Sequence, residues 1–254
     1  MRENIIEKLK YIEEKENIKI LFAVESGSRA WGFPSKDSDY DVRFIYIHPI
    51  EWYLSIEEKR DVIEYPIDNL LDISGWDIKK ALGLFKKSNP SFMEWINSPV
   101  IYRKQGSFLD RVKDLSSIYF YPKASMNHYL NMATSNYKHY LMGNQVKIKK
   151  YFYVLRPILA CKWIENEKTI VPMEFEVLLN SQVKDDELYH EIKTLLDMKK
   201  LEKEFDTRAK INIINNYIEK ELKHYNEYVK SIEDKRELSF SALDQLFMDV
   251  LKES

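Results

Sequence analysis

One short stretch near the start of this chain constrains its fold more than any other. Residues 18–25 are rich in Ile, Leu, Phe and Val, and they predict a strand that runs into the pair Gly27-Ser28. After a short loop, a second apolar strand is predicted over residues 40–48, with Asp39 and Asp41 at its beginning. A Gly-Ser turn is thus placed between two strands, next to two closely spaced acids.

The two carboxylates indicate a cation site. Because side chains alternate faces along a strand, Asp39, Asp41 and Arg43 share one face, whereas Tyr40 and Val42 face the other way and can be buried. Two carboxylates this close repel each other unless a cation lies between them. Mg²⁺ is a hard cation that binds carboxylate oxygens and commonly keeps phosphate oxygens in its shell. An Asp-x-Asp pair alone is also common at solvated strand edges and in structural calcium sites.

The Gly-Ser turn supplies a complementary anion site. Gly27 has no Cβ, so its backbone can approach a phosphate closely, and the Ser28 hydroxyl and the following amides can donate to phosphate oxygens. An anion-binding turn beside a metal-binding pair is the minimum needed to transfer a nucleotidyl group. Such a transfer depends mainly on positioning and charge neutralisation, with two metal ions holding the attacking and leaving oxygens. The two motifs together are far more specific than either alone.

This order of elements resembles the polymerase-beta-like nucleotidyltransferase superfamily, in particular its bacterial and phage branch of RNA-repair-pathway proteins. The resemblance extends over residues 20–165 and rests on these runs: 27–33 (GSRAWGF), 38–44 (SDYDVRF), 75–82, 88–90, 94–95, 98–102 and 149–157. It implies that two Mg²⁺ or Mn²⁺ ions are held by Asp39, Asp41 and a third carboxylate, which helps to deprotonate the attacking hydroxyl.

Two residues are the main candidates for that third carboxylate. Asp72 lies in an apolar-acid-apolar segment, residues 70–73, that predicts a short strand, which is the context of the superfamily's third ligand. Asp77 precedes a helical stripe of apolar residues and would cap that helix by accepting free amides of its first turn. We favour Asp72 as metal ligand or general base and Asp77 as the cap. Glu64 is a weaker third candidate.

The middle of the chain combines basic and aromatic side chains. Residues 115–164 contain no Asp or Glu but seven Lys and Arg, although the whole chain of 254 residues has a net charge of -2. A predicted helix over residues 146–163 places Lys149, Tyr153 and Arg156 on one face. Basic side chains interleaved with aromatic rings suit a phosphate-bearing ligand whose bases can stack, but they also fit a helical core with solvated lysines.

The superfamily commonly directs Lys and Tyr side chains of a helical second domain at the incoming triphosphate. With the turn and the neighbouring arginines, the candidate nucleotide-binding residues are Gly27, Ser28, Arg29, Arg43, Lys149, Tyr153 and Arg156. Arg43 could equally pair with Asp39 or Asp41 when no metal is bound.

The remaining pattern predicts an α+β architecture with a small mixed sheet and helices, followed by an α-helical domain. We expect a nucleotidyltransferase catalytic domain over residues 1–118 and a helical nucleotide- and substrate-binding domain over residues 119–254, with the nucleotide in the cleft between them. Further helices are expected at 3–15 (covering the sheet), 77–88, 91–97, 183–237 (exposed) and 239–251 (docked), and further strands at 61–66 and 70–73.

Composition excludes several classes of protein. The single cysteine, Cys161, excludes a disulfide framework and a cysteine-based zinc site. No apolar run approaches the ~20 residues of a membrane span, and the N-terminus does not read as a signal peptide, so we expect a cytoplasmic protein that does not enter membranes. The sequence leaves the oligomeric state open.

We therefore predict a metal-dependent nucleotidyltransferase that uses an NTP and releases pyrophosphate. An RNA end is the favoured acceptor because of the family resemblance and the basic, aromatic stretch. A protein side chain is the alternative acceptor. A binding module that has kept the fold and lost the chemistry is a further alternative, and the presence of Asp39, Asp41 and Asp72 argues against it.

Overall fold

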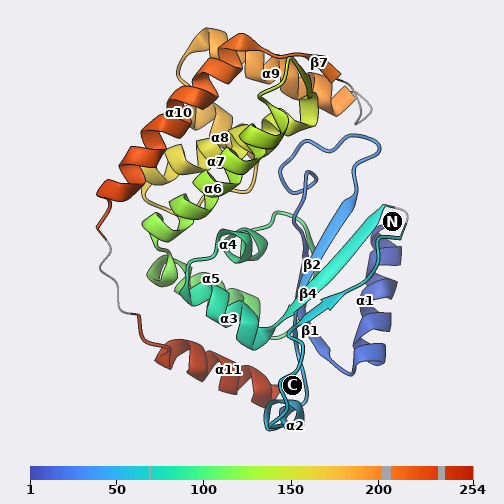
Figure 1. Cartoon of the computed structure of the whole chain (residues 1–254). Helices are drawn as coiled ribbons and strands as arrows, with labels where there is room; N and C mark the ends of the chain where they lie inside the picture. Colours follow the sequence, from blue (N-terminus) through green and yellow to red (C-terminus); the bar gives the residue numbers. More distant parts are fainter. Residues whose placement is uncertain (69, 202–206, 234–237, 254) are drawn as a thin grey trace. The chain divides into compact units, whose positions relative to one another are not determined.

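A five-stranded mixed sheet organises the first of the two units into which the chain divides in the computed structural model (Figure 1). The structure describes residues 1–68, 70–201, 207–233 and 238–253. The first unit consists of Met1–Ala30, Asp39–Tyr119 and Glu237–Ser254, and the second consists of Trp31–Ser38 and Phe120–Arg236. The segment between the Gly-Ser turn and the Asp-x-Asp strand thus belongs to the second unit.

The sheet has the strand order β3-β4-β2-β1-β5. Its strands are β1 (Lys19–Glu25), β2 (Tyr40–Ile47), β3 (Val62–Glu64), β4 (Leu71–Asp77) and β5 (Ile101–Lys104). Strands β2 and β4 are parallel, and the other neighbours are antiparallel. In the parallel register, Asp41 lies opposite Asp72, and Tyr46 lies opposite Asp77.

Helices cover both faces of this sheet, as Figure 1 shows. Helix α1 (Arg2–Glu16) buries Ile5, Leu9 and Ile12 in a core with Val42 and Phe44 of β2. On the other face, Phe108 of α5 (Phe108–Tyr119) stacks on Phe22 of β1, with ring centroids 6.1 Å apart. The prediction that the first helix covers the sheet is confirmed. Because both faces are covered, strand β1 is apolar almost throughout and is buried from Ile20 to Glu25.

Helix α3 (Ile78–Lys86) begins where β4 ends. The Asp77 carboxylate accepts a hydrogen bond from the Lys79 amide at 2.8 Å, which confirms the interpretation of Asp77 as a helix cap. Helix α4 (Pro90–Ile96) follows with proline in its first turn, where a missing amide proton has no cost. The other helices of this unit are α2 (Ile50–Tyr53) and α11 (Ser241–Glu253).

The second unit is almost entirely helical. It contains α6 (Pro122–Tyr140), α7 (Ile148–Glu167), α8 (Phe175–Gln182), α9 (Asp186–Leu201), α10 (Asn212–Ser231) and a two-stranded sheet of β6 (Gln145–Lys147) and β7 (Thr207–Ala209). Helix α7 runs through this unit's core and continues past Pro157. Phe33, from the segment that follows the Gly-Ser turn, packs on Phe152 and Phe175 with ring centroids 5.0 and 5.6 Å apart.

The α+β prediction is confirmed, but one detail of it is wrong. Helices α9 and α10 are not merely exposed, because each buries an apolar stripe in the core of the second unit, including Leu195 and Ile218. These stripes recur at helical spacing within sequences that are otherwise dense in Lys and Glu. The terminal helix α11 docks as predicted, with Leu243, Leu246 and Val250 buried. Among the described residues, no helix has the length and apolar character needed to cross a bilayer.

Candidate active site

The turn after β1 is fastened to the beginning of β2. The Ser26 amide donates to the Asp41 carbonyl at 2.9 Å, and the Ala30 amide donates to the Gly27 carbonyl at 2.9 Å, which closes the turn around Ser28. A Cβ placed on Gly27 would lie 1.7 Å from Oδ2 of Asp41. The close approach of the Asp41 carboxylate therefore excludes any side chain at position 27 unless Asp41 moves.

Asp41 and Asp72 come together because they occupy facing positions on parallel strands. Arg43 lies beside them, with Nη2 2.7 Å from Oδ2 of Asp72 and 3.5 Å from Oδ1 of Asp41. Its Nη1 donates to the carbonyls of Val42 and Asp72, each at 3.1 Å. The guanidinium therefore supplies positive charge to both carboxylates.

Asp39 and Arg29 lie at the edge of this cluster. Asp39 precedes β2 and is exposed. Arg29 donates to the Asp39 carbonyl at 3.2 Å, and its guanidinium carbon lies 3.7 Å from the centroid of the Tyr40 ring. This contact fixes the chain at the entry to β2.

Burial is the main influence on the charge of Asp41. It raises the pKa of Asp41 from 3.8 to about 6, against the opposing effect of Arg43. The negative charges of Glu25, Asp72 and Asp39 add to the increase. A cation brought next to Asp41 would reverse this shift, because it stabilises the ionised form.

The donor chemistry of this cluster fits a hard divalent cation such as Mg²⁺, because two carboxylates are directed at one cationic group. Within the residues that the structure describes, no three Asp, Glu, His or Cys side chains converge as a metal-binding group. The structure thus presents Asp41 and Asp72 as a pair that shares Arg43, with the exposed Asp39 nearby in sequence.

The three predicted nucleotide-binding residues of α7 belong to the second unit. Arg156 is buried, donates to the Met173 carbonyl at 3.3 Å and lies 4.7 Å from the centroid of the Trp31 ring. Tyr153 is half-buried and meets the same Trp31 ring edge-on, with centroids 6.1 Å apart. Lys149 is also half-buried. The predicted site residues therefore form two groups, one in each unit.

Reasoning from the sequence missed one residue of the first group, Glu25. Its carboxylate is fully buried and accepts a hydrogen bond from the Asp41 amide at 2.8 Å. The signal was present in the sequence, because Glu25 is the only acid in the apolar run of β1 and directly precedes the Gly-Ser turn region.

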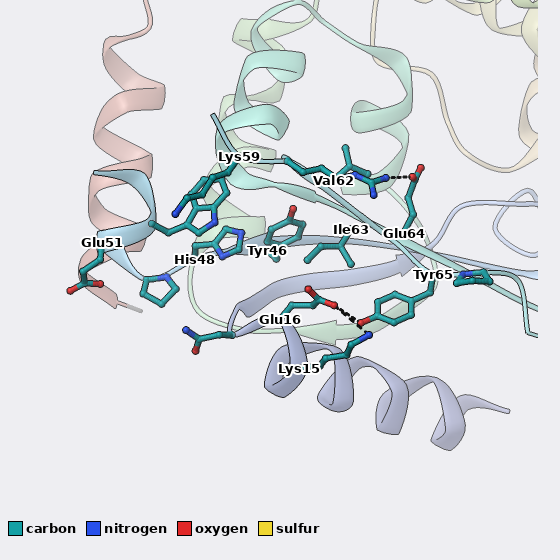
Figure 2. Close-up of a pocket in the computed structure, with 15 residues that line it drawn as sticks. Lys15, Glu16, Tyr46, His48, Glu51, Lys59, Val62, Ile63, Glu64 and Tyr65 are labelled. Carbon is teal, nitrogen blue, oxygen red and sulfur yellow. Dashed lines mark hydrogen bonds and ion pairs between the residues drawn. The ribbon is translucent and has the colours of Figure 1, made fainter. Parts of the chain in front are cut away.

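A cavity of about 800 Å³ lies at the far end of β2, where the strand reaches Tyr46 and His48 (Figure 2). Its charged side chains largely neutralise one another: Arg60 lies 2.5 Å from Glu64, and Lys15 lies 3.8 Å from Glu16. The lining residues do not include Asp39, Asp41 or Asp72. Glu64, the weaker candidate for the third carboxylate, lies here and not beside Asp41.

The family model for the RNA repair pathway DNA polymerase beta family matches residues 1–249 of this chain. The chain belongs to this family. The resemblance inferred from the Gly-Ser and Asp-x-Asp motifs is thereby confirmed, and nucleotidyl transfer is the reaction class that the family implies, with an NTP as substrate.

Two known proteins are similar to this chain. YcgL of Bacillus subtilis (strain 168), described as an uncharacterized protein, is 51% identical over 253 residues, which cover 100% of this chain and 97% of YcgL. The crystal structure of a nucleotidyltransferase-like protein from Exiguobacterium sibiricum 255-15 matches 98% of this chain and 80% of its own chain, with a TM-score of 0.32 and 13% identity.

Proposed function

We propose that this protein transfers a nucleoside monophosphate from an NTP to an acceptor hydroxyl, with Asp39, Asp41 and Asp72 as its catalytic carboxylates. The observation that carries the proposal is the placement of Asp41 opposite Asp72, against the Gly27 turn. Membership of a polymerase-beta family supports the reaction class.

The three carboxylates would hold two Mg²⁺ or Mn²⁺ ions, which neutralise the triphosphate and lower the pKa of the attacking hydroxyl. In the transfer, the acceptor oxygen forms a bond to the α-phosphorus, and the bond from the α-phosphorus to the pyrophosphate oxygen breaks. Asp72, which is partly exposed, accepts the proton of the acceptor hydroxyl. Pyrophosphate is the leaving group.

The remaining residues of the turn and strand bind phosphate in this proposal. The Ser28 hydroxyl and the amides that follow it donate to phosphate oxygens. Arg43 would exchange its contacts with Asp41 and Asp72 for phosphate oxygens, since a guanidinium forms paired hydrogen bonds with phosphate as readily as with carboxylate. Arg29 is a further phosphate contact in this proposal. In the helical unit, Lys149 and Tyr153 are further candidates for nucleotide contact, whereas Arg156 is buried against Trp31.

An RNA end is the acceptor that we propose. The family's description as an RNA repair pathway family supports it, as does the basic, aromatic stretch between residues 115 and 164. The rival acceptor is a protein side chain, which would need no basic path for a polyanion.

The test is incubation of the purified protein with each α-labelled NTP, Mg²⁺ or Mn²⁺, an RNA oligonucleotide and, separately, cell lysate. We expect label on the RNA with the wild-type protein and none with Asp41→Asn. Asp110→Asn is the matched control, because Asp110 is an exposed aspartate of the same unit that pairs with Lys104 at the surface. Label on a lysate protein would instead establish a protein acceptor, and no label in any reaction would contradict the proposal.

A further inference from the structure

Glu25 has no exposed surface and occupies the last position of β1, directly after the apolar run from Ile20 to Val24. Burying a carboxylate is unfavourable unless hydrogen bonds replace its lost hydration. In Glu25, Oε1 accepts from the Asp41 amide at 2.8 Å and, over a long 3.5 Å, from the Gly27 amide. Oε2 accepts from the Tyr102 hydroxyl at 2.5 Å. Both oxygens are therefore satisfied.

These partners come from three separate segments of the chain. The Gly27 amide belongs to the anion-binding turn, the Asp41 amide to the start of β2, and Tyr102 to the edge strand β5. The main chain of Glu25 is also held, because its amide donates to the Val100 carbonyl at 3.0 Å and its carbonyl accepts from the Ser98 hydroxyl at 2.6 Å. Glu25 is thus held in place through both its carboxylate and its main chain.

The two amides that share Oε1 belong to the two residues in closest contact at the site. The backbone of Gly27 and the carboxylate of Asp41 are so near each other that even a methyl group does not fit between them. Hydrogen bonds to an ionised acceptor are stronger than neutral ones, so a single carboxylate can hold both main-chain segments in place.

We propose that Glu25, held by Tyr102, is a positioning residue that sets the Asp41 carboxylate against the anion-binding turn. Glu25 contacts neither nucleotide nor acceptor, and it acts through the main chain of Asp41 and Gly27. The benefit of this placement for nucleotidyl transfer rests on the proposed function, but the placement itself does not. Groups of this kind commonly hold metal ligands in their productive orientation.

Three variants separate positioning from a general contribution to folding. Glu25→Gln keeps an oxygen that can accept from the Asp41 amide, and its amide nitrogen can donate to the Tyr102 oxygen. Glu25→Ala removes every one of these hydrogen bonds, and Tyr102→Phe removes only the support at Oε2. The matched control is Glu221→Gln, because Glu221 is a buried glutamate of the second unit that lies 3.9 Å from Lys162.

The first measurement is amide hydrogen exchange on the full-length protein without metal or nucleotide. Loss of the Glu25 hydrogen bonds should speed exchange at the Asp41 and Gly27 amides by on the order of 10-fold or more in Glu25→Ala. Exchange in the middle of β1 should stay as slow as in the wild-type protein. Glu25→Gln should restore most of the protection, and Tyr102→Phe should give an intermediate effect. Unchanged exchange at these two amides, or an equal increase across the whole sheet, would overturn the inference. If Glu25→Ala does not fold, Tyr102→Phe decides by the same criterion.

The second measurement is Mn²⁺ affinity, by electron paramagnetic resonance, together with steady-state transfer. If Glu25 orients the metal ligand Asp41, the Glu25→Ala variant should have an Mn²⁺ affinity and a kcat that are each about 10–100-fold lower than those of the wild-type protein. Glu25→Gln should recover most of this loss, and Glu221→Gln should match wild type. A folded Glu25→Ala variant that keeps wild-type Mn²⁺ affinity and kcat would contradict the positioning role of Glu25. A wild-type protein that transfers nothing would instead overturn the proposed function, and the exchange result alone would then decide the role of Glu25.

Discussion

At each end of the parallel pair of strands β2 and β4, an aspartate lies opposite a residue of the other strand. The two ends differ in which groups donate hydrogen bonds to the aspartate carboxylates. At the first end, Asp41 faces Asp72, and the two share the guanidinium of Arg43. At the second end, Asp77 faces Tyr46 and accepts hydrogen bonds from the Tyr53 hydroxyl at 2.6 Å and the Lys79 amide at 2.8 Å.

Exposure separates the two ends as clearly as hydrogen bonding does. Asp77 is 1% exposed, whereas the side chains of Asp41 and Asp72 are 28% and 31% exposed. A buried carboxylate that neutral donors satisfy stabilises the fold, in this case by capping α3. Two accessible carboxylates with one shared cation can still bind a further cation. Environment, and not residue type, therefore distinguishes the catalytic candidates Asp41 and Asp72 from the structural aspartate Asp77.

The largest expected effect comes from removing the charge of Asp41. Asp41→Asn should reduce nucleotidyl transfer by more than about 100-fold, since it removes a proposed metal ligand and not merely one of its supports. The variant should remain folded, because the substitution relieves repulsion among neighbouring carboxylates. Initial rates with an α-labelled NTP and circular dichroism measure the two quantities. Substantial activity in the folded variant would contradict the metal assignment.

Matched alanine variants of Asp72 and Asp77 test the comparison between the two ends. Asp72→Ala should lose activity with little change in stability, because Asp72 is partly exposed and caps no helix. Asp77→Ala should keep its activity but lose about 1–3 kcal/mol of unfolding free energy, because it removes a helix cap and leaves the Tyr53 hydroxyl without its acceptor. Urea denaturation and transfer rates provide the readouts. The reverse pattern would make Asp77 the third carboxylate.

Gly27→Ala should disturb the first end without removing any charge. The new methyl group cannot coexist with the Asp41 carboxylate where it now lies, so Asp41 must move. We expect a loss of stability of about 1–3 kcal/mol and a loss of activity of about 10-fold. Gly83→Ala is the control, because a Cβ there meets nothing within 4 Å and should slightly stabilise helix α3. Equal behaviour of the two variants would show that the turn and Asp41 are not tightly coupled.

The smallest expected effect is a pH dependence of stability in the metal-free protein. The folded pKa of Asp41, about 6, is higher than its ordinary value of 3.8. A raised carboxyl pKa means that the folded state binds the proton more tightly than the unfolded state does. The stabilisation that results is fully present below pH 4 and is lost as pH rises through 6. Asp41→Asn should therefore match wild type near pH 4 and exceed its stability by up to about 3 kcal/mol at pH 7.5. Urea denaturation across this range measures the difference, and a difference that does not vary with pH would contradict the assigned shift.

Local patterns were sufficient to predict the first end of the β2–β4 pair and the cap at the second. The apolar strands and the Gly-Ser turn can each be recognised from a few residues of sequence. The same holds for Asp72, which lies between apolar neighbours in a short strand. Glu25 escaped prediction because its role depends on Tyr102, which lies 77 residues further along the chain. Strand β5, which carries Tyr102, was not predicted either, because four residues are too few to show an alternating pattern.

The helical unit shows a second limit of the same kind. The segment Trp31–Ser38 lies between two motifs of the first unit in sequence, yet Phe33 packs in the core of the second. No local property of that segment indicates this, because its partners Phe152 and Phe175 are more than a hundred residues away in sequence. Arg156 was correctly placed on a helix face, but its burial against Trp31 depends on the same distant segment.

The central claim is that metal binds at the Asp41–Asp72 end of the β2–β4 pair. Its most direct test is to locate bound Mn²⁺ on these two strands. Bound Mn²⁺ broadens the NMR signals of nearby amides, so a titration of the isotope-labelled protein reports the location of the ion. We predict that the amides of Gly27, Asp41 and Asp72 broaden first and that those of Tyr46 and Asp77 do not. Broadening that begins at Tyr46 and Asp77, or that spreads evenly over the sheet, would contradict the assignment of the Asp41–Asp72 end as the metal-binding site.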